Sequence, residues 1–349
     1  MSVGDLSTLL VWGAMTAFTI GFVAYTWELA RLAETWSRAE REPVSVDARV
    51  PVAAGVGARA ASTTNPVPGS GAPRDATGTT KAAGISRSTT YLGVVLLLAG
   101  IVTRGIAAGR WPTANMYEFT LVGAFVAVVV LVVVQRRRYI PFLGVVVHGI
   151  AVLALALALL VFFLHADAVQ PALQSYWLVL HVGVAITATG VFTVAFAAAV
   201  LQVLTEAREA GRSRLDQPWG RFDAVRRPLS RFRVTGPAWQ WLGSVPTARE
   251  LEALSFRLNA IGFVLWTFTL IGGAIWAEHA WGRYWGWDPK EVATFVAWVV
   301  YAAYLHARTT RGWSGARAAR FVFVGYAVVL ANFTVINLFV TGKHAYSGR

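Results

Sequence analysis

The sequence predicts an all-α, polytopic membrane protein with about eight transmembrane helices. Of its 349 residues, 56% are hydrophobic and only 14% are charged, a balance typical of proteins embedded in lipid. Apolar runs of about 20 residues recur along the chain, and each is long enough to cross a bilayer. The Lys and Arg residues gather in the gaps between these runs, where they orient helices. We therefore expect membrane lipid around the chain and no nucleic-acid partner.

The expected elements follow from these runs. The spans cover residues 6–29, 90–109, 118–135, 140–164, 177–204, 257–276, 291–308 and 320–341. We expect 1–29 to hold a retained first helix, because no basic region and cleavage site of a signal peptide precede it. Residues 30–89 are expected to be a cytoplasmic, largely disordered linker, since Pro, Gly, Ala, Ser and Thr dominate 43–88 without an apolar face. Residues 90–349 would then form one seven-helix membrane domain.

The basic residues predict how the spans are oriented. Most of them fall in the gaps 30–89, 136–139, 205–256 and 309–319, which the positive-inside rule assigns to the cytoplasm. Both termini and the gap before residue 291 are then extracytoplasmic. The inner gap 205–256 ends with the capping-box spacing Thr247-Ala248-Arg249-Glu250, so a surface helix should lead directly into the sixth span.

The outer connection 276–291 is unusually rich in aromatic residues. Its rings are Trp276, Trp281, Tyr284, Trp285 and Trp287. A belt of interfacial tryptophans would be spread over many helices, whereas these rings crowd into one connection. A flat platform for a planar ligand therefore explains them better than a belt does.

The segment Asp288-Pro289-Lys290-Glu291 closes this connection and opens the seventh span. Asp at the N-cap, Pro at the first helical position and Glu at the third make a good helix start. A structural role therefore explains Asp288 and Glu291 at least in part.

Two of the six histidines are expected on the same face as the aromatic connection. His181 lies about one turn into the fifth span from its outer end, and His344 lies just beyond the outer end of the eighth. Each alone is typical of a hydrogen-bonded polar residue at a helix end. Two imidazoles that approach a planar macrocycle from opposite sides, however, predict bis-histidine haem ligation.

The other histidines occupy different positions. His306 lies about 22 Å of helix rise beyond Glu291, so it cannot reach the aromatic connection. It marks either a separate inner haem site or a side chain that extends to the membrane interface. We expect His148 to be buried and hydrogen-bonded, with a second inner ligand as the alternative. His165 and His279 lie in outer loops and carry no separate argument for a role.

Several segments together resemble a known family. They are Trp281-Gly-Arg-Tyr-Trp-Gly-Trp-Asp-Pro-Lys-Glu291, 170–182 around His181, 254–263, Tyr304-Leu-His306, 337–348 around His344, and Pro112-Thr-Ala-Asn115-Met-Tyr117-Glu118. The first is similar to the WWD signature of haem-handling proteins, and the whole set resembles the CcsA/ResC family of system II cytochrome c biogenesis, often labelled CcsB in actinobacteria. The resemblance extends from about residue 90 to the end of the sequence.

The resemblance implies a function in the plasma membrane. Such a subunit binds or translocates haem b and presents it on the extracytoplasmic WWD surface. There it promotes covalent thioether attachment of haem to a CxxCH apocytochrome c, together with a ResB/Ccs1-type membrane partner. As an enzyme, it would be a subunit of a cytochrome c synthase, or haem lyase. The chain has no cysteine, so the reacting thiols belong to the apocytochrome, which thioredoxin-like reductants would keep reduced.

The resemblance also implies roles for individual residues. Haem would be positioned by Trp281, Trp285, Trp287 and Asp288. The wider set of cofactor-binding residues would be Trp276, Trp281, Tyr284, Trp285, Trp287, Asp288, Asn115, Tyr117 and Glu118. The iron ligands would be His181 and His344 at the outer site, with His306 at an inner site.

Two other function classes fit the same sequence. The chain could export or chaperone haem without taking part in its attachment. It could also be a polytopic transporter or scaffold for another amphiphile, with an aromatic belt that only resembles a platform. The absorption spectrum of bound haem distinguishes the haem-binding hypotheses from the transporter.

Overall fold

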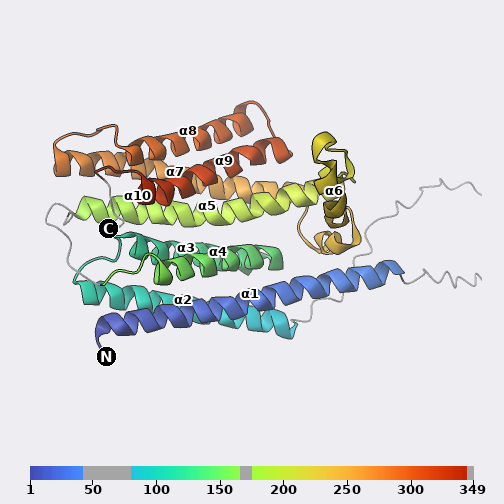
Figure 1. Cartoon of the computed structure of the whole chain (residues 1–349), viewed down its shortest axis with the longest axis horizontal. Helices are drawn as coiled ribbons and strands as arrows, with labels where there is room; N and C mark the ends of the chain where they lie inside the picture. Colours follow the sequence, from blue (N-terminus) through green and yellow to red (C-terminus); the bar gives the residue numbers. More distant parts are fainter. Residues whose placement is uncertain (42–79, 166–174, 344–349) are drawn as a thin grey trace, which may run out of the picture.

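A computed structural model of the chain describes residues 1–41, 80–165 and 175–343, and within these ranges the regular structure is helical. The long helices lie side by side along roughly one axis (Figure 1). They are α1 (Val3–Arg41), α2 (Lys81–Ala108), α3 (Met116–Arg137), α4 (Pro141–Leu160), α5 (Tyr176–Glu209), α7 (Ala248–Trp281), α8 (Pro289–Thr310) and α9 (Gly315–Phe333), followed by the short α10 (Val335–Phe339). The predicted all-α class is confirmed.

Seven of the described helical segments are long and apolar enough to cross a membrane, which confirms a polytopic membrane protein. These segments are α1 to α5, α7, and α9 continued into α10. The expected span 291–308 corresponds to α8, which is not among the seven. Even so, α8 lies beside α9 and runs antiparallel to it (Figure 1). The prediction of about eight spans therefore exceeds by one the number that meets the apolar criterion.

The long helices place the connections at two opposite ends of the bundle. The N-terminus, the connection 282–288 after α7 and the end of α10 lie at one end, which we call the WWD end (Figure 1). Helix α6 (Asp223–Leu229) and its neighbouring short helices lie at the other, which we call the α6 end. His181, near the start of α5, is therefore at the same end as the aromatic connection, as expected.

Helices α1 and α2 extend into the expected linker. Helix α1 continues to Arg41, and α2 begins at Lys81 instead of near residue 90. Thr80 caps α2 by accepting a hydrogen bond from the backbone N–H of Ala83, and Ala83 is buried with Ser86. Small side chains thus let the first turns of α2 pack closely, although their composition is that of a loop. The rest of the expected linker, 42–79, lies outside the described residues.

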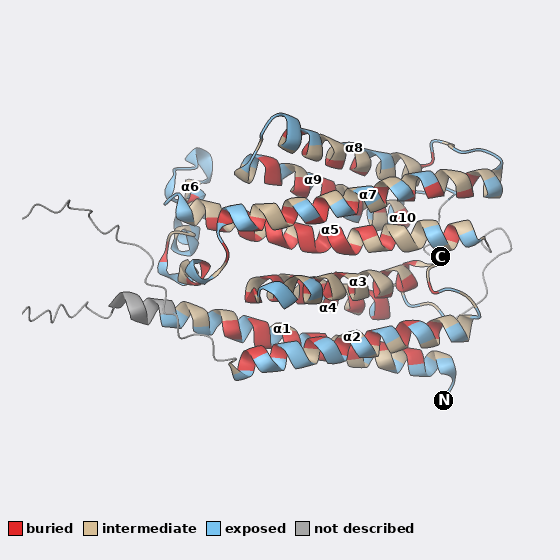
Figure 2. Ribbon diagram, turned by 180° about the vertical axis from the view of Figure 1, so that it is seen from behind, coloured by how far each residue is buried: buried red, intermediate tan, exposed pale blue. Residues whose placement is uncertain are grey.

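Helix α5 forms the centre of the bundle and packs against α3, α7 and α9. Two thirds of its most apolar window, 67%, is buried, and Figure 2 shows buried residues concentrated along it. Close approach to α7 depends on Gly262, because a Cβ at that position would lie 2.5 Å from the ring of Phe192. Phe192 in turn stacks on Tyr301 of α8 with ring centroids 3.9 Å apart. This packing fixes the relative positions of the helices that carry the site.

Helix α7 joins the α6 end to the WWD end without interruption. It begins with the predicted capping box, in which Thr247 and Glu250 exchange hydrogen bonds. The expected surface helix therefore leads directly into the sixth span, as predicted. The preceding segment is built from η2 (Arg214–Asp216), η3 (Gly220–Phe222), α6, η4 (Ser230–Phe232) and η5 (Pro237–Ser244). Trp241 of η5 is buried and stacks on Phe142 of α4, with ring centroids 5.3 Å apart.

Candidate functional site

The aromatic connection is shorter than its sequence suggested, because α7 continues through Trp281. The helix ends at Gly282, whose φ of 71° is a left-handed conformation that glycine adopts readily. Trp276 and Trp281 are therefore helical residues, and only Tyr284, Trp285 and Trp287 lie in the loop itself.

The end of the loop is fixed by the predicted helix start. Asp288 caps α8 by accepting a hydrogen bond from the backbone N–H of Lys290 at 3.0 Å. The Glu291 carboxylate accepts from the backbone N–H groups of Gly286 at 2.8 Å and Asp288 at 3.1 Å. The expected capping role of both acids is confirmed, and Glu291 also holds the loop two residues before the cap.

Asp288 makes a second contact that the sequence did not predict. Its Oδ2 accepts a hydrogen bond of 2.7 Å from the backbone N–H of Lys343. A Cβ on Gly342 would lie 2.7 Å from the same oxygen, so glycine permits this close approach. The C-terminal segment is thereby held against the WWD loop. His344, the next residue, lies outside the described residues. No local pattern reveals this contact, because the partners are 55 positions apart.

The aromatic rings separate into two groups. Trp276 is buried and packs edge to face with Trp281, with centroids 4.8 Å apart. The Lys343 ammonium lies 5.5 Å from the centroid of the Trp281 ring. In the loop, Trp285 and Trp287 pack edge to face at 5.8 Å. The first group closes the end of α7, whereas in the second Trp285 also packs against Phe295 of α8 and Trp287 is exposed.

Trp287 is the most unusual of these residues. It is 78% exposed. Its φ is 57°, and no other non-glycine residue in the described ranges has a positive φ. A bulky residue in this backbone region is strained, and such strain is characteristic of functional sites. The loop therefore holds an exposed indole in a conformation that its own sequence disfavours.

His181 is held in a defined orientation on α5. Its Nδ1 donates a hydrogen bond of 2.8 Å to the backbone carbonyl of Thr269 on α7, since a carbonyl can only accept. Its ring lies parallel to that of Trp276, with an interplanar angle of 6° and centroids 6.3 Å apart. Gly273 provides the space for the imidazole, because a Cβ there would lie 2.7 Å from His181 Cε1.

His181 also lines a cavity of about 100 Å³ near the WWD end. The cavity lies between the start of α3 and helices α5, α7, α8, α9 and α10. Its polar lining includes His181, Lys290, Asn115, Asn332 and Asn337. Neither Trp285 nor Trp287 of the loop is among its lining residues. An imidazole, a cation and several amides therefore converge on one space beside the WWD loop.

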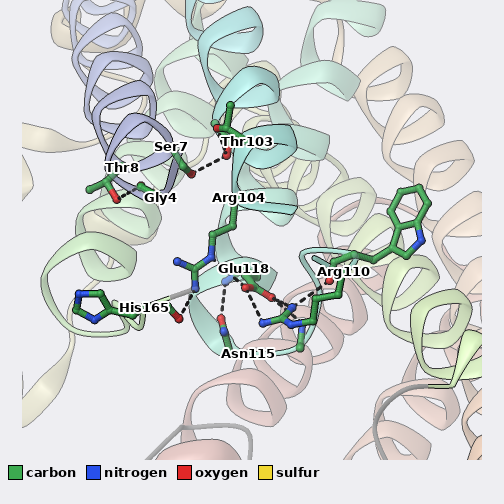
Figure 3. A network of polar contacts seen from close by, with 12 residues as sticks. Gly4, Ser7, Thr8, Thr103, Arg104, Arg110, Asn115, Glu118 and His165 are labelled. Carbon is green, nitrogen blue, oxygen red and sulfur yellow. Dashed lines mark hydrogen bonds and ion pairs between the residues drawn. The ribbon is translucent and has the colours of Figure 1, made fainter. Parts of the chain in front are cut away.

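The predicted residues at the start of α3 have different environments. Asn115 lines the cavity and caps α3 by accepting a hydrogen bond from the backbone N–H of Glu118 at 2.9 Å. Glu118 is fully buried and accepts from the guanidinium groups of Arg104 at 3.1 Å and Arg110 at 2.7 Å (Figure 3). Tyr117 is buried beneath the Arg104 guanidinium. Glu118 and Tyr117 thus hold the connection between α2 and α3 that carries Asn115 to the cavity.

The remaining histidines lie apart from this cavity. His148 is fully buried, with Nε2 3.0 Å from Thr90 Oγ1 and Nδ1 3.0 Å from the Gly144 carbonyl, which confirms the buried, hydrogen-bonded role. His306 is exposed near the α6 end of α8. His165 and His279 are also exposed, and His279 belongs to the last turn of α7 instead of a loop.

Comparisons with known proteins agree on one family. The profile of the "Cytochrome C assembly protein" family matches residues 113–344. A protein of Prochlorococcus marinus named "Cytochrome c biogenesis protein CcsA" is 32% identical over 256 residues, covering 72% of this chain and 80% of its own length. The protein of the same name from a Synechococcus species is 33% identical over 268 residues, with 75% and 86% covered.

A solved structure shares the arrangement of helices. It is "Cytochrome c Heme Lyase CcmF", which matches with a TM-score of 0.59 at 15% identity and covers 95% of this chain and 47% of its own. This likeness concerns the fold. The family profile and the identity to curated relatives carry the assignment, and together they show that this chain belongs to the CcsA family of cytochrome c biogenesis proteins.

Proposed function

We propose that the chain binds haem b at the WWD end and promotes its thioether attachment to an apocytochrome c. The observation that carries this proposal is the environment of His181. Its imidazole is oriented by Thr269, is parallel to Trp276 and lines a cavity beside the WWD loop. Family membership supports the general role in cytochrome c biogenesis.

His181 has the orientation expected of an iron ligand. A histidine that donates one ring N–H to a backbone carbonyl is fixed in the tautomer whose other nitrogen binds metal. With Nδ1 donating to Thr269, that nitrogen is Nε2. We propose His344 as the second axial ligand. Asp288 supports this role, since it holds the preceding residue, Lys343, against the loop.

The tryptophans would contact the porphyrin from the loop side. Trp287 is largely exposed, and Trp285 packs against its edge. Indole rings offer flat apolar surface on which a porphyrin stacks favourably. Trp276 and Trp281 would support the His181 side of the site.

The chain contributes positioning to the proposed reaction. A thiol of the apocytochrome adds across a haem vinyl group, so that sulfur bonds to one vinyl carbon and the proton goes to the other, with no net oxidation. Holding the vinyl carbons beside the thiols supplies most of what such an addition needs. The chain has no cysteine, so other proteins, such as thioredoxin-like reductants, would keep these thiols reduced.

The opposite end of the molecule would receive haem. His306 is exposed near the α6 end of α8, where a ResB/Ccs1-type membrane partner could complete an inner site. We propose that the WWD end is outside the plasma membrane, because the basic connections lie at the α6 end. A topology reporter fused to the C-terminus should then give an extracytoplasmic signal, and a cytoplasmic signal would contradict this orientation.

The absorption spectrum of the purified chain tests the haem site. We expect a Soret band typical of bis-imidazole haem, and the double variant His181→Ala, His344→Ala should lose or strongly shift it. The matched control is His279→Ala, which removes an exposed imidazole from the same end of the molecule. An unchanged spectrum in the double variant would show that these residues are not the ligands.

A haem chaperone that takes no part in attachment would use the same site. Because the reacting thiols would belong to the apocytochrome, the geometry of the cavity fits holding haem as well as positioning it. Apocytochrome c and haem supplied to the purified complex separate the two hypotheses. Attachment that survives the double histidine variant favours the chaperone.

A further inference from the structure

The cavity beside His181 has a polar lining that includes Lys290. The acid that acts on the Lys290 ammonium is Asp288, whose carboxylate already caps α8 and accepts a hydrogen bond from the Lys343 backbone N–H. Asn332 and Asn337 are 7% and 8% exposed. The Oδ1 atom of each amide is buried and has no hydrogen-bond partner in the described parts of the chain. Lys290, Asn332 and Asn337 therefore line the same small space.

The amides are held in place through their other ends. Asn332 Nδ2 donates to Thr294 Oγ1 at 2.8 Å, and Asn337 Nδ2 donates to the Phe333 carbonyl at 2.7 Å. Buried polar atoms in folded proteins are nearly always hydrogen-bonded to protein, water or ligand. Leaving them unpaired costs free energy, so unpaired amide oxygens on two residues that line a cavity beside a cation indicate a polar occupant.

We propose that this cavity binds a propionate carboxylate of haem, with Lys290 as its counter-ion. The inference rests on the proposed haem-binding function and assigns the orientation of haem within it. The ammonium of Lys290 would donate to the carboxylate.

Size and position favour a carboxylate-bearing side chain as the occupant. A space of about 100 Å³ holds a carboxylate with a few waters, since one water needs only about 10–15 Å³ of such volume. His181 lines the same cavity as Lys290. A ligand whose centre binds an imidazole and whose edge carries acids would therefore satisfy both residues.

This orientation has a consequence for the reaction. The two propionates of haem lie on one edge of the porphyrin, and the vinyl groups lie on the other half of the ring. Binding the propionate edge inside the cavity directs the vinyl groups away from it, toward the open surface of the WWD end. Lys290 would thus be a positioning residue for the vinyl groups.

Haem dimethyl ester, in which both propionates are esterified, provides the test. The full-length chain in detergent is titrated with haem and with the ester, and binding is followed by the Soret band. The variants are Lys290→Met and Lys290→Arg, and the control is Lys81→Met, the same change on an exposed lysine of α2. We expect the wild type to bind haem about tenfold more tightly than the ester, because the ester lacks the carboxylate and one charge-assisted hydrogen bond contributes about that much affinity.

Lys290→Met should lose this preference by binding haem about tenfold more weakly while its affinity for the ester is unchanged. Lys290→Arg and Lys81→Met should retain most of it. The ester affinity reports whether Lys290→Met is folded. Two results would overturn the role of Lys290 while leaving the proposed haem-binding function intact. In the first, wild type and Lys290→Met prefer haem over the ester to the same extent; in the second, Lys290→Met binds haem and the ester equally more weakly than wild type does. Absence of a Soret band in the wild type overturns the proposed function as well.

Discussion

His148 and His181 are both imidazoles on apolar helices, and the structure gives them opposite environments. Both ring nitrogens of His148 lie 3.0 Å from oxygen atoms of Thr90 and Gly144, and its ring packs against Tyr25. His181 donates through Nδ1 to one carbonyl and lines a cavity. A histidine that serves the fold is enclosed and bonded on both sides. His181 is half-buried, is held by the Thr269 carbonyl and borders the cavity.

The comparison shows why histidine count or depth in the membrane does not identify a ligand. Either residue could satisfy the general rule that polar groups in membranes need partners. Glycine lies against both rings: a Cβ on Gly273 would lie 2.7 Å from His181 Cε1, and a Cβ on Gly21 would lie 3.1 Å from His148 Cδ2. What differs is the rest of the surroundings, because the rings of Phe18 and Tyr25 also pack against His148, whereas His181 borders the cavity.

The largest stability effect should come from His148→Ala. The change removes two hydrogen bonds and leaves a cavity beside Tyr25 and Phe18, so we expect a loss of roughly 3 kcal/mol in the free energy of unfolding. The measurement is denaturant or thermal unfolding in detergent. Haem bound per folded molecule should be unchanged, because the ring lies outside the candidate site.

His181→Ala is the matched comparison and should give the reverse pattern. Its side chain is only half-buried, so the free energy of unfolding should fall by only about 1 kcal/mol. Haem binding should be lost. If His148→Ala removes haem from folded protein, the distinction between the two histidines is wrong.

The sequence was sufficient for the features that depend on local pattern. The lengths of the apolar runs predicted the seven candidate spans, with α8 as one further helix, and the caps at Thr247 and Asp288 were found where expected. The aromatic connection was correctly recognised as unusual, although Trp276 and Trp281 belong to α7. Helix propensity and composition cannot decide how far a helix continues once it packs, which is why α2 begins earlier than predicted.

The parts that could not be predicted join distant segments. Asp288 meets Lys343, and His181 meets Thr269, through contacts that no spacing in the sequence encodes. The convergence of Lys290 with Asn332 and Asn337 likewise exists only after the helices pack. Motif resemblance identified Asn115, Tyr117 and Glu118 as one group, whereas the structure assigns only Asn115 to the cavity lining and uses Glu118 for a buried ion pair.

The smallest change that distinguishes the His181 environment is one methyl group. In Gly273→Ala the new Cβ would lie 2.7 Å from His181 Cε1, so the ring must move and the hydrogen bond to Thr269 is disturbed. Loss of such an orienting contact typically weakens metal binding about tenfold or more. In Gly272→Ala the Cβ would lie 3.6 Å from His181 Cβ, an ordinary contact, and haem affinity should stay within about twofold. Soret titrations of both variants measure the difference, and equal affinities would show that the position of the His181 ring does not control haem binding.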